Sequence, residues 1–259
     1  MQNINYLDIT SKLPKLGAKK LYFSLDISAY DGVRLLILQK LFLINELRKR
    51  YLKDRDIALL IKINSYFLQI NTLINSFDFI FDKLIVAKFR KLLSEILPLL
   101  GSIESFKKDK NHKFKELLND IERYFDSGFE SFCFELEIFL YDTHSFYCSS
   151  NSLISHSASY AIRKKIVNLR QNIRSKSVLK SNLLQELSML TNIFLELFKL
   201  DKFESKLNKI TNLYIKYRNI NEKNIKKSLK KELNKKLKKF DKKLSKQSKK
   251  LKSHYQKDN

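Results

Sequence analysis

The sequence predicts an all-α protein, a multi-helix bundle that ends in a long basic C-terminal helix. Only four glycines and two prolines occur among 259 residues, which is too few turn-forming residues for a sandwich, a barrel or a doubly wound sheet. Apolar residues make up 44% of the chain, as expected for a protein with a packed core. After Asp31, apolar positions recur at helical spacing over most of the sequence.

The N-terminal region is the least helical part, because apolar and polar side chains alternate at period two over residues 21–29. This pattern allows one short extended segment near residues 20–29, either as a strand or lying across helices, since no partner strand is evident nearby. Asp31 is then expected to cap a helix over about residues 32–52.

Helical spacing resumes at Asp56 and indicates one long helix or two stacked helices. Asn71 and Asn75 mark the expected break, and Pro98 and Gly101 are expected to end the run.

Two further helices are predicted on either side of Gly128. The first covers residues 112–125. The second carries apolar residues at i, i+3, i+4, i+7 and i+11 from Phe129 onward. Alternation over residues 134–140 also allows a strand in place of this second helix.

A serine-rich segment divides the chain, since residues 142–159 contain seven serines and show little periodicity. The expected organisation is an N-terminal helical region at 1–142, a Ser-rich loop at 143–159, a hairpin or coiled-coil region at 160–221 and a Lys-rich amphipathic tail at 222–259.

Helices are expected over residues 160–174 and 178–200, and the second merges into an apolar seam with steps of 3, 4, 3, 4 and 3. The seam consists of Leu200, Phe203, Leu207, Ile210, Tyr214 and Tyr217. This heptad spacing favours a helix hairpin or a short coiled coil, and it makes self-association through the seam a hypothesis.

The net charge is +24, from 41 lysines, 10 arginines and 27 acidic residues. Lysine codons are AT-rich, so the total is less informative than its distribution. The 222–259 segment holds sixteen lysines and four acids, half of the net charge. The rest of the chain shows no obvious cluster of charge.

The Lys-rich tail is the candidate nucleic-acid-binding site, because its apolar residues keep a helical stripe while lysines fill the other positions. The candidate residues are Lys226, Lys227, Lys230, Lys231, Lys235, Lys238, Lys239, Lys242 and Lys243. Lysine neutralises phosphate without reading bases, and arginine is absent here, so low sequence specificity is expected. A solvated coiled-coil face is the alternative.

A catalytic or metal site is not expected. The one cluster with ligand chemistry consists of Asp142, His144, Cys148 and His156. Its spacing matches no zinc motif, so polar loop residues are favoured over ligands or a Cys148 nucleophile. Carboxylates at Glu130, Glu135 and Glu137 are interpreted as the solvated side of a helix. No phosphate-cradling glycine loop occurs, and no cofactor is predicted.

A cytoplasmic location is expected, because Cys133 and Cys148 form no CxxC pair and residues 1–10 lack a signal-peptide pattern. Charged residues interrupt the most apolar stretches, so no membrane-spanning segment is predicted.

The leading functional hypothesis is a non-catalytic helical adaptor that binds nucleic acid or a ribonucleoprotein through its basic C-terminal helix. A scaffold that acts through protein contacts, peripheral attachment to an anionic membrane, and an enzyme that uses the Ser-rich loop are the alternatives, in that order.

Overall fold

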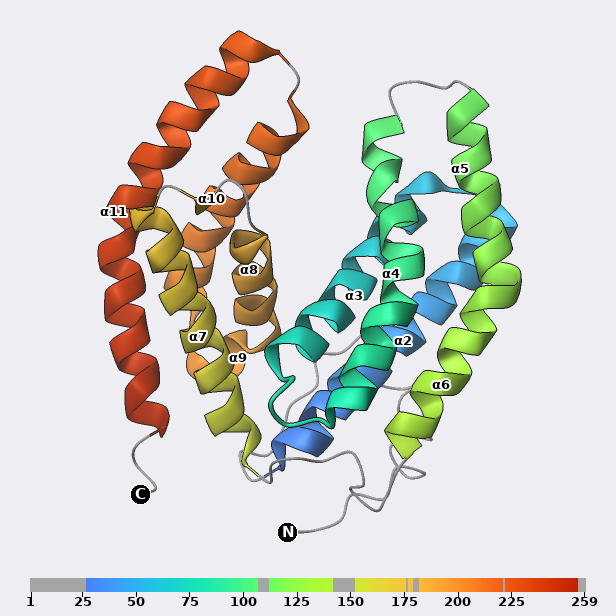
Figure 1. The fold of residues 1–259 in the computed structure, drawn as a ribbon, viewed down its shortest axis with the longest axis horizontal. Helices are drawn as coiled ribbons and strands as arrows, with labels where there is room; N and C mark the ends of the chain where they lie inside the picture. Colours follow the sequence, from blue (N-terminus) through green and yellow to red (C-terminus); the bar gives the residue numbers. More distant parts are fainter. Residues whose placement is uncertain are drawn as a thin grey trace. The chain divides into compact units, whose positions relative to one another are not determined.

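A computed structural model describes residues 27–106, 112–141, 152–175, 177–178, 182–220 and 222–255, and it confirms the all-α multi-helix bundle (Figure 1). The chain forms two compact units, Met1–Ile154 and Ser155–Asn259. Each unit is a helix bundle with its own buried core.

Within its described residues, the first unit contains four helical segments. They are α2 (Ala29–Asp54), α3 (Ile57–Ser76), α4 (Lys83–Phe106) and the uninterrupted series of α5 (His112–Arg123), η1 (Tyr124–Gly128) and α6 (Phe129–Tyr141). Each segment packs on its neighbours, α2 on α3, α3 on α4, α4 on α5 and α6 on α2, so the bundle closes.

Aromatic rings fill the centre of this unit. Tyr51, Phe67, Phe125, Phe129 and Phe132 are each almost fully buried. Their ring centroids lie 5.5–6.5 Å apart along the contacting pairs, mostly in edge-to-face geometry. Such pairs add about 0.5–1.5 kcal/mol each beyond the burial of their area, which explains why α2, α3 and α6 converge here.

Ser28, rather than Asp31, caps α2. The Ser28 Oγ accepts a hydrogen bond from the Asp31 backbone N–H at 3.0 Å and donates to the Asp31 carboxylate at 2.7 Å. Ser28 is therefore the N-cap of α2, with Asp31 in the first turn of the helix. The predicted start near residue 32 is therefore wrong by three residues.

The predicted extended segment near residues 20–29 lies mostly outside the described residues. Its described part contains a single antiparallel bridge between Ser28 and Leu153, flanked by hydrogen bonds from Ala29 N–H to Ser152 O and from Ile154 N–H to Ile27 O. Ala29 already belongs to α2, so the extended segment ends before that residue.

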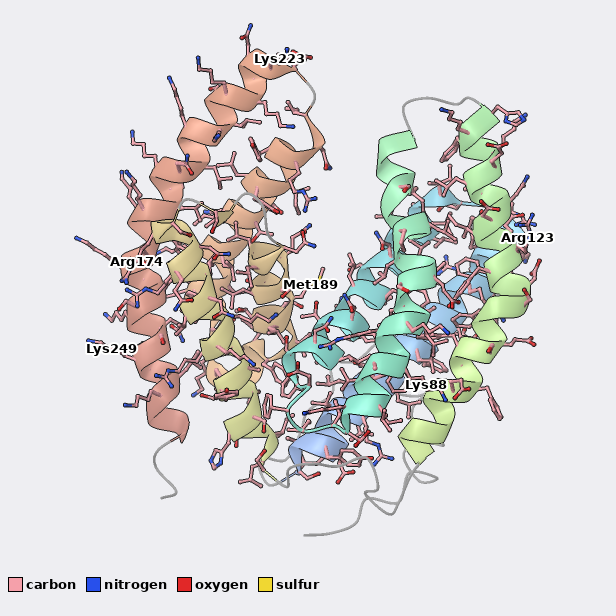
Figure 2. The ribbon with its side chains drawn as sticks, in the orientation of Figure 1. Lys88, Arg123, Arg174, Met189, Lys223 and Lys249 are labelled. Atoms are coloured by element: carbon pink, nitrogen blue, oxygen red, sulfur yellow. The ribbon has the colours of Figure 1, made fainter. Side chains whose placement is uncertain are left out.

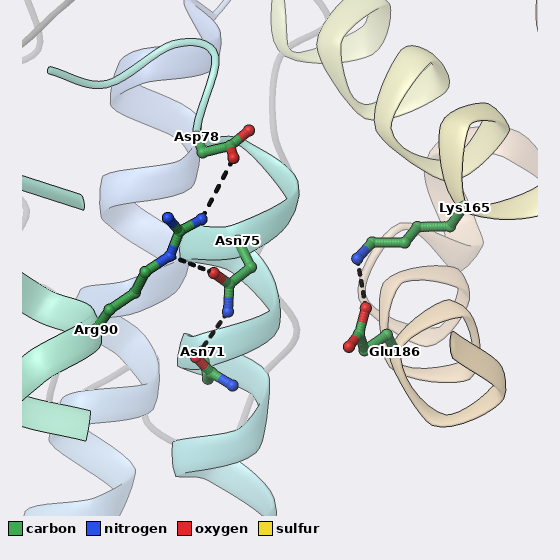
Figure 3. A network of polar contacts seen from close by, with 6 residues as sticks. All are labelled: Asn71, Asn75, Asp78, Arg90, Lys165 and Glu186. Atoms are coloured by element: carbon green, nitrogen blue, oxygen red, sulfur yellow. Dashed lines mark hydrogen bonds and ion pairs between the residues drawn. The ribbon is translucent and has the colours of Figure 1, made fainter. Parts of the chain in front are cut away.

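The break predicted near Asn71 and Asn75 is confirmed in position to within a few residues, because α3 ends at Ser76 and α4 begins at Lys83. Arg90 of α4 ties the two helices together (Figure 3). It donates to the Asn75 side chain at 2.7 Å and to the Asp78 carboxylate at 3.3 Å.

Pro98 and Gly101 do not end α4, which continues to Phe106. Pro98 removes one backbone hydrogen bond from the helix. The next turns nevertheless bury Leu100 and Ile103 completely, and each such burial contributes about 1.5–3 kcal/mol. Continued packing therefore outweighs the local breaker.

Gly128 does not separate two helices either. The helix runs through it as a π-helical turn, Tyr124–Gly128, and then continues as α6 to Tyr141. The strand alternative for residues 134–140 is therefore wrong. A Cβ at residue 128 would lie 2.8 Å from Cδ2 of Tyr124, which shows why a residue without a side chain occupies this turn.

The second unit contains α7 (Ile154–Arg174), α8 (Leu183–Ile193), α9 (Leu195–Phe198), α10 (Asp201–Asn219) and α11 (Lys223–Tyr255). Because α7 begins at Ile154, the predicted loop over 142–159 overlaps it. The helix predicted over 178–200 is shorter and interrupted, since Lys199 adopts a left-handed conformation with φ of 50° and ends α9.

These helices form an antiparallel bundle, and side-chain contacts define the directions. Lys165 of α7 contacts Glu186 of α8 (Figure 3). The contacts between α8 and α10 are Leu184–Thr211 and Asn192–Glu204, and those between α10 and α11 are Phe203–Phe240 and Tyr217–Lys226. The contacts between α7 and α11 are Ser159–Leu251 and Arg170–Asp241. In the last three pairs of helices, early residues of one helix meet late residues of the other.

The predicted heptad seam lies in α10, except for Leu200, which directly precedes that helix. It packs against α11, a helix of the segment predicted as a separate tail. Five of its six residues are buried and Tyr217 is half-buried. Phe203 stacks on Phe240 of α11 with centroids 5.6 Å apart. A second chain would reach this seam only if α10 and α11 separated, and self-association through it stays a prediction.

Candidate polyanion-binding face

Most of the basic tail, Lys223–Tyr255, is an integral helix of the second unit. The apolar stripe of α11 is buried at Leu233, Leu237, Phe240, Leu244 and Leu251. Toward the start of the helix, Leu229 is half-buried and Ile225 is 43% exposed. Thirty-three residues at about 1.5 Å each give α11 a length of about 50 Å.

Two polar contacts attach α11 to α7. The Arg170 Nε donates to the Asp241 carboxylate at 2.7 Å, and both side chains are about three-quarters covered. The Ser159 hydroxyl, which is buried, donates to the backbone carbonyl of Leu251 at 2.6 Å. Together with the ring stack on α10, they orient α11 about its own axis, and this orientation decides which lysines face solvent.

All nine predicted lysines lie on α11, and all except Lys226 are exposed. Lys226 is half-buried, with its ammonium 5.5 Å from the centre of the Tyr217 ring. Six more lysines of this helix share the exposed surface: Lys223, Lys236, Lys246, Lys249, Lys250 and Lys252. Figure 2 shows nitrogen-tipped side chains along the length of α11, with Lys223 and Lys249 labelled.

Acidic groups neutralise little of this face. Within α11, Glu232 pairs with Lys236 at 2.6 Å, and Asp241 is committed to Arg170. Eight of the nine predicted lysines are exposed. None of the ion pairs described above joins one of them to an acidic residue of α11.

A second row of lysines lies on α10, and the sequence did not reveal it as a group. Lys202, Lys206, Lys209 and Lys216 are all exposed, and steps of four, three and seven residues place them on one side of the helix. Lys206 lies against Lys243 of α11. Hydrogen bonding to Lys206, followed by desolvation and the Lys206 charge, lowers the pKa of the Lys243 ammonium.

The charge is divided very unequally between the two units. Residues 155–259 contain 29 basic and 8 acidic residues, a net charge of +21, whereas residues 1–154 contain 22 basic and 19 acidic residues, a net charge of +3. The expectation that charge outside the tail shows no cluster is therefore wrong. Residues 155–221 add nine positive charges to the twelve of the tail.

The other candidate residues form no site in the part of the chain that the structure describes. Asp142, His144 and Cys148 lie outside it, and His156 lies on α7. No group of three or more His, Cys, Asp or Glu side chains suited to a metal ion occurs among the described residues. Glu130 is exposed and Glu135 pairs with Lys88 of α4, as expected of the polar side of a helix.

One described helix, α3, is long and apolar enough to cross a membrane by length and composition. Nine of its residues, including Leu60, Ile63, Phe67 and Ile70, are buried in the first unit. This burial is typical of the core helix of a bundle.

The sequence matches no protein-family model and shows no significant similarity to a curated protein. The functional argument therefore starts from the surface of the second unit.

Proposed function

We propose that this protein is a non-catalytic helical adaptor that binds nucleic acid, free or within a ribonucleoprotein, through the lysine face of α11. The observation that carries the proposal is the division of α11 into two sides. Four of its five leucines are buried in the bundle, and all of its lysines except Lys226 are exposed along about 50 Å. A rigid row of cations suits a regularly charged polymer, because each neutralised phosphate releases counterions.

The buried leucine stripe argues against membrane insertion through α11. A basic amphipathic helix enters the headgroup region with its apolar side, and here Leu233, Leu237 and Leu244 are already covered by the protein's own helices. Only electrostatic adsorption to anionic lipid remains as a competing mode for this face. A cytoplasmic location belongs to the same proposal.

Low sequence specificity follows from the chemistry of the face. The described part of α11 contains lysines and no arginine, and lysine offers a point charge where guanine readout uses a planar fork. We therefore expect similar affinities for nucleic acids of different sequence at equal length and salt.

The test compares two full-length variants with equal loss of charge. K231Q/K235Q/K238Q/K242Q removes four exposed lysines from the outer side of α11, and K53Q/K62Q/K91Q/K113Q removes four exposed lysines from the first unit. Truncation before α11 is unsuitable, because it would uncover the seam on α10. Binding to a DNA or RNA duplex of about 24 base pairs is measured against salt concentration.

The α11 variant should reduce the slope of log K against log salt by about 2 to 4, since each lost phosphate contact removes about 0.9. The first-unit variant should retain the wild-type slope. Equal loss in both variants would show an effect of net charge alone, and an unchanged slope in the α11 variant would exclude this face. Binding to anionic vesicles in preference to nucleic acid would also contradict the proposal.

A further inference from the structure

The lysine row of α10 lies along the border between α10 and α11. Lys202 directly precedes Phe203, Lys206 precedes Leu207 and Lys216 precedes Tyr217. Phe203 and Tyr217 contact α11, through the Phe240 ring and the Lys226 ammonium. One residue corresponds to about 100° of helix rotation, so each lysine sits just outside the α10–α11 interface.

The same rule holds on α11. Lys236 precedes Leu237, Lys239 precedes Phe240 and Lys243 precedes Leu244, and these three apolar side chains are buried. In an antiparallel pair, residues that precede the interface positions of both helices lie on the same side of the interface. Two lysine rows therefore flank one side of the α10–α11 contact.

The two rows meet where Lys206 lies beside Lys243. Hydrogen bonding to Lys206, followed by desolvation and the Lys206 charge, lowers the pKa of the Lys243 ammonium. Neighbouring like charges repel each other, and an anion between them would remove the repulsion. An arrangement of this kind is expected where a surface receives negative charge.

The number of rows suits a double-stranded partner. The lysine rows lie side by side on two neighbouring antiparallel helices. Two phosphate rows border each groove, whereas a single strand offers one row. Two parallel rows of cations can therefore contact both strands across a groove.

Stacking platforms for single-stranded bases are missing from this face as far as its side chains are described. Phe203 and Phe240 stack on each other and are buried, Tyr214 is buried, and Tyr217 is half-buried beside Lys226. Proteins that bind single strands without sequence preference combine a basic groove with exposed aromatic rings.

We infer that the lysine rows of α10 and α11 form one two-helix surface that holds the two phosphate rows of a nucleic-acid duplex. This inference rests on the proposed function and specifies its substrate class. It adds Lys202, Lys206, Lys209 and Lys216 to the site, and it assigns contacts to the phosphate backbone rather than to bases.

The experiment uses the full chain carrying K202Q/K206Q/K209Q/K216Q, beside K236Q/K239Q/K243Q, which removes the α11 row on the same side of the contact and should weaken duplex binding likewise, and the α11 and first-unit variants above. The probes are a duplex of about 24 base pairs and an unstructured thymidine single strand of equal length, each titrated over a range of salt. An arginine version of the α10 variant keeps the charge and serves as the rescue. Circular dichroism melts confirm that each variant is folded.

The α10 variant should reduce the duplex salt slope by about 2 to 4, the arginine version should restore it, and single-strand binding should change little. If the α10 variant binds duplex like wild type while the α11 variant is weakened, the inference fails and the proposed function stands. If the α11 variant is also unaffected, both fail. Equal losses for duplex and single strand would overturn the duplex assignment.

Discussion

Gly128 is the residue at which the π-helical turn of the first unit depends on a missing side chain. We expect Gly128→Ala to lower the free energy of unfolding by about 1–3 kcal/mol, because the added Cβ would lie 2.8 Å from Cδ2 of Tyr124 and force the ring or the backbone to move. Gly101→Ala is the matched control.

A Cβ at Gly101 would meet nothing within 4 Å, and this position is an exposed interior residue of α4. Alanine should therefore stabilise the helix by about 0.5–1 kcal/mol. Urea unfolding followed by circular dichroism measures both variants. Similar effects of the two substitutions would show that the turn at Gly128 adapts without cost.

Tyr51 connects α2 to α5 by donating to the Glu122 carboxylate at 3.1 Å, and Arg55 forms an ion pair with the same carboxylate. Burial, then the charge of Glu122, raise the pKa of Tyr51 to about 12 from 10.0. A raised tyrosine pKa means that the folded state favours the neutral phenol. The stability that the Tyr51 hydroxyl contributes is complete below pH 10 and is lost as pH rises toward about 12.

Tyr51→Phe tests this linkage. At neutral pH the variant should be less stable than wild type by about 0.5–1.5 kcal/mol, the contribution of one hydrogen bond. The difference should shrink as pH rises from 10 to about 12, because ionised Tyr51 would face the Glu122 charge. Denaturant unfolding at several pH values measures it. A difference that stays constant across this range would mean that Tyr51 titrates normally.

At the level of the helix, α11 depends on its buried stripe. Leu244→Ala should lower the free energy of unfolding by about 2–5 kcal/mol, because Leu244 is fully buried between helices of the second unit. Ile225→Ala removes a similar volume from a side chain that is 43% exposed and should cost less than about 1 kcal/mol.

Hydrogen exchange of the full chain locates both effects. Amides of α10 and α11 should lose protection in Leu244→Ala and keep it in Ile225→Ala, while those of α2 and α3 stay unchanged. If Leu244→Ala left the protection of α11 intact, the helix would not depend on docking against the bundle.

The existence of most helices was predictable and their ends were not, for a physical reason that Ser28 and Pro98 illustrate. Apolar spacing repeats over many residues, so one exception does not hide a stripe. A helix end depends on one or two contacts. Ser28 and Asp31 are both good capping residues, and the bridge from Ser28 to Leu153 is a long-range contact absent from local sequence. At Pro98, the burial of Leu100 and Ile103 in the following turns outweighs the local breaker.

The candidate site was predictable only in part. The lysines of α11 are dense enough in sequence to be recognised as a group. On α10, four lysines share nineteen residues with acidic Asp201 and Glu204, and nothing local distinguishes them. Their relation to α11 appears only after antiparallel pairing brings Lys206 beside Lys243.

For the whole molecule, the unequal charge predicts an unequal response to salt. The second unit carries +21 and the first +3. Repulsion within α11 alone, from lysine pairs four residues apart, is expected to cost about 2–4 kcal/mol at low salt. Raising salt from about 50 mM to about 500 mM shortens the screening length severalfold and should relieve most of it.

Hydrogen exchange at the two salt concentrations separates the units within one sample. Amides of α10 and α11 should gain protection with salt, and amides of α2, α3 and α4 should change little. Uniform protection changes along the chain would indicate a general solvent effect instead. A loss of protection in α11 would show that its ion pair with Arg170 matters more than the lysine repulsion.

The burial of the α11 leucines has a consequence for biosynthesis. Because α11 follows α7, α8 and α10 in the chain, a ribosome adding about 5–20 residues per second needs about 2–7 s to complete it after α10 has been made. Throughout that interval Phe203, which stacks on Phe240 of α11 in the finished bundle, has no α11 to cover it. The nascent second unit is then a substrate for chaperones, and a premature stop codon within α11 would leave an aggregation-prone chain in place of a protein that has merely lost its lysines.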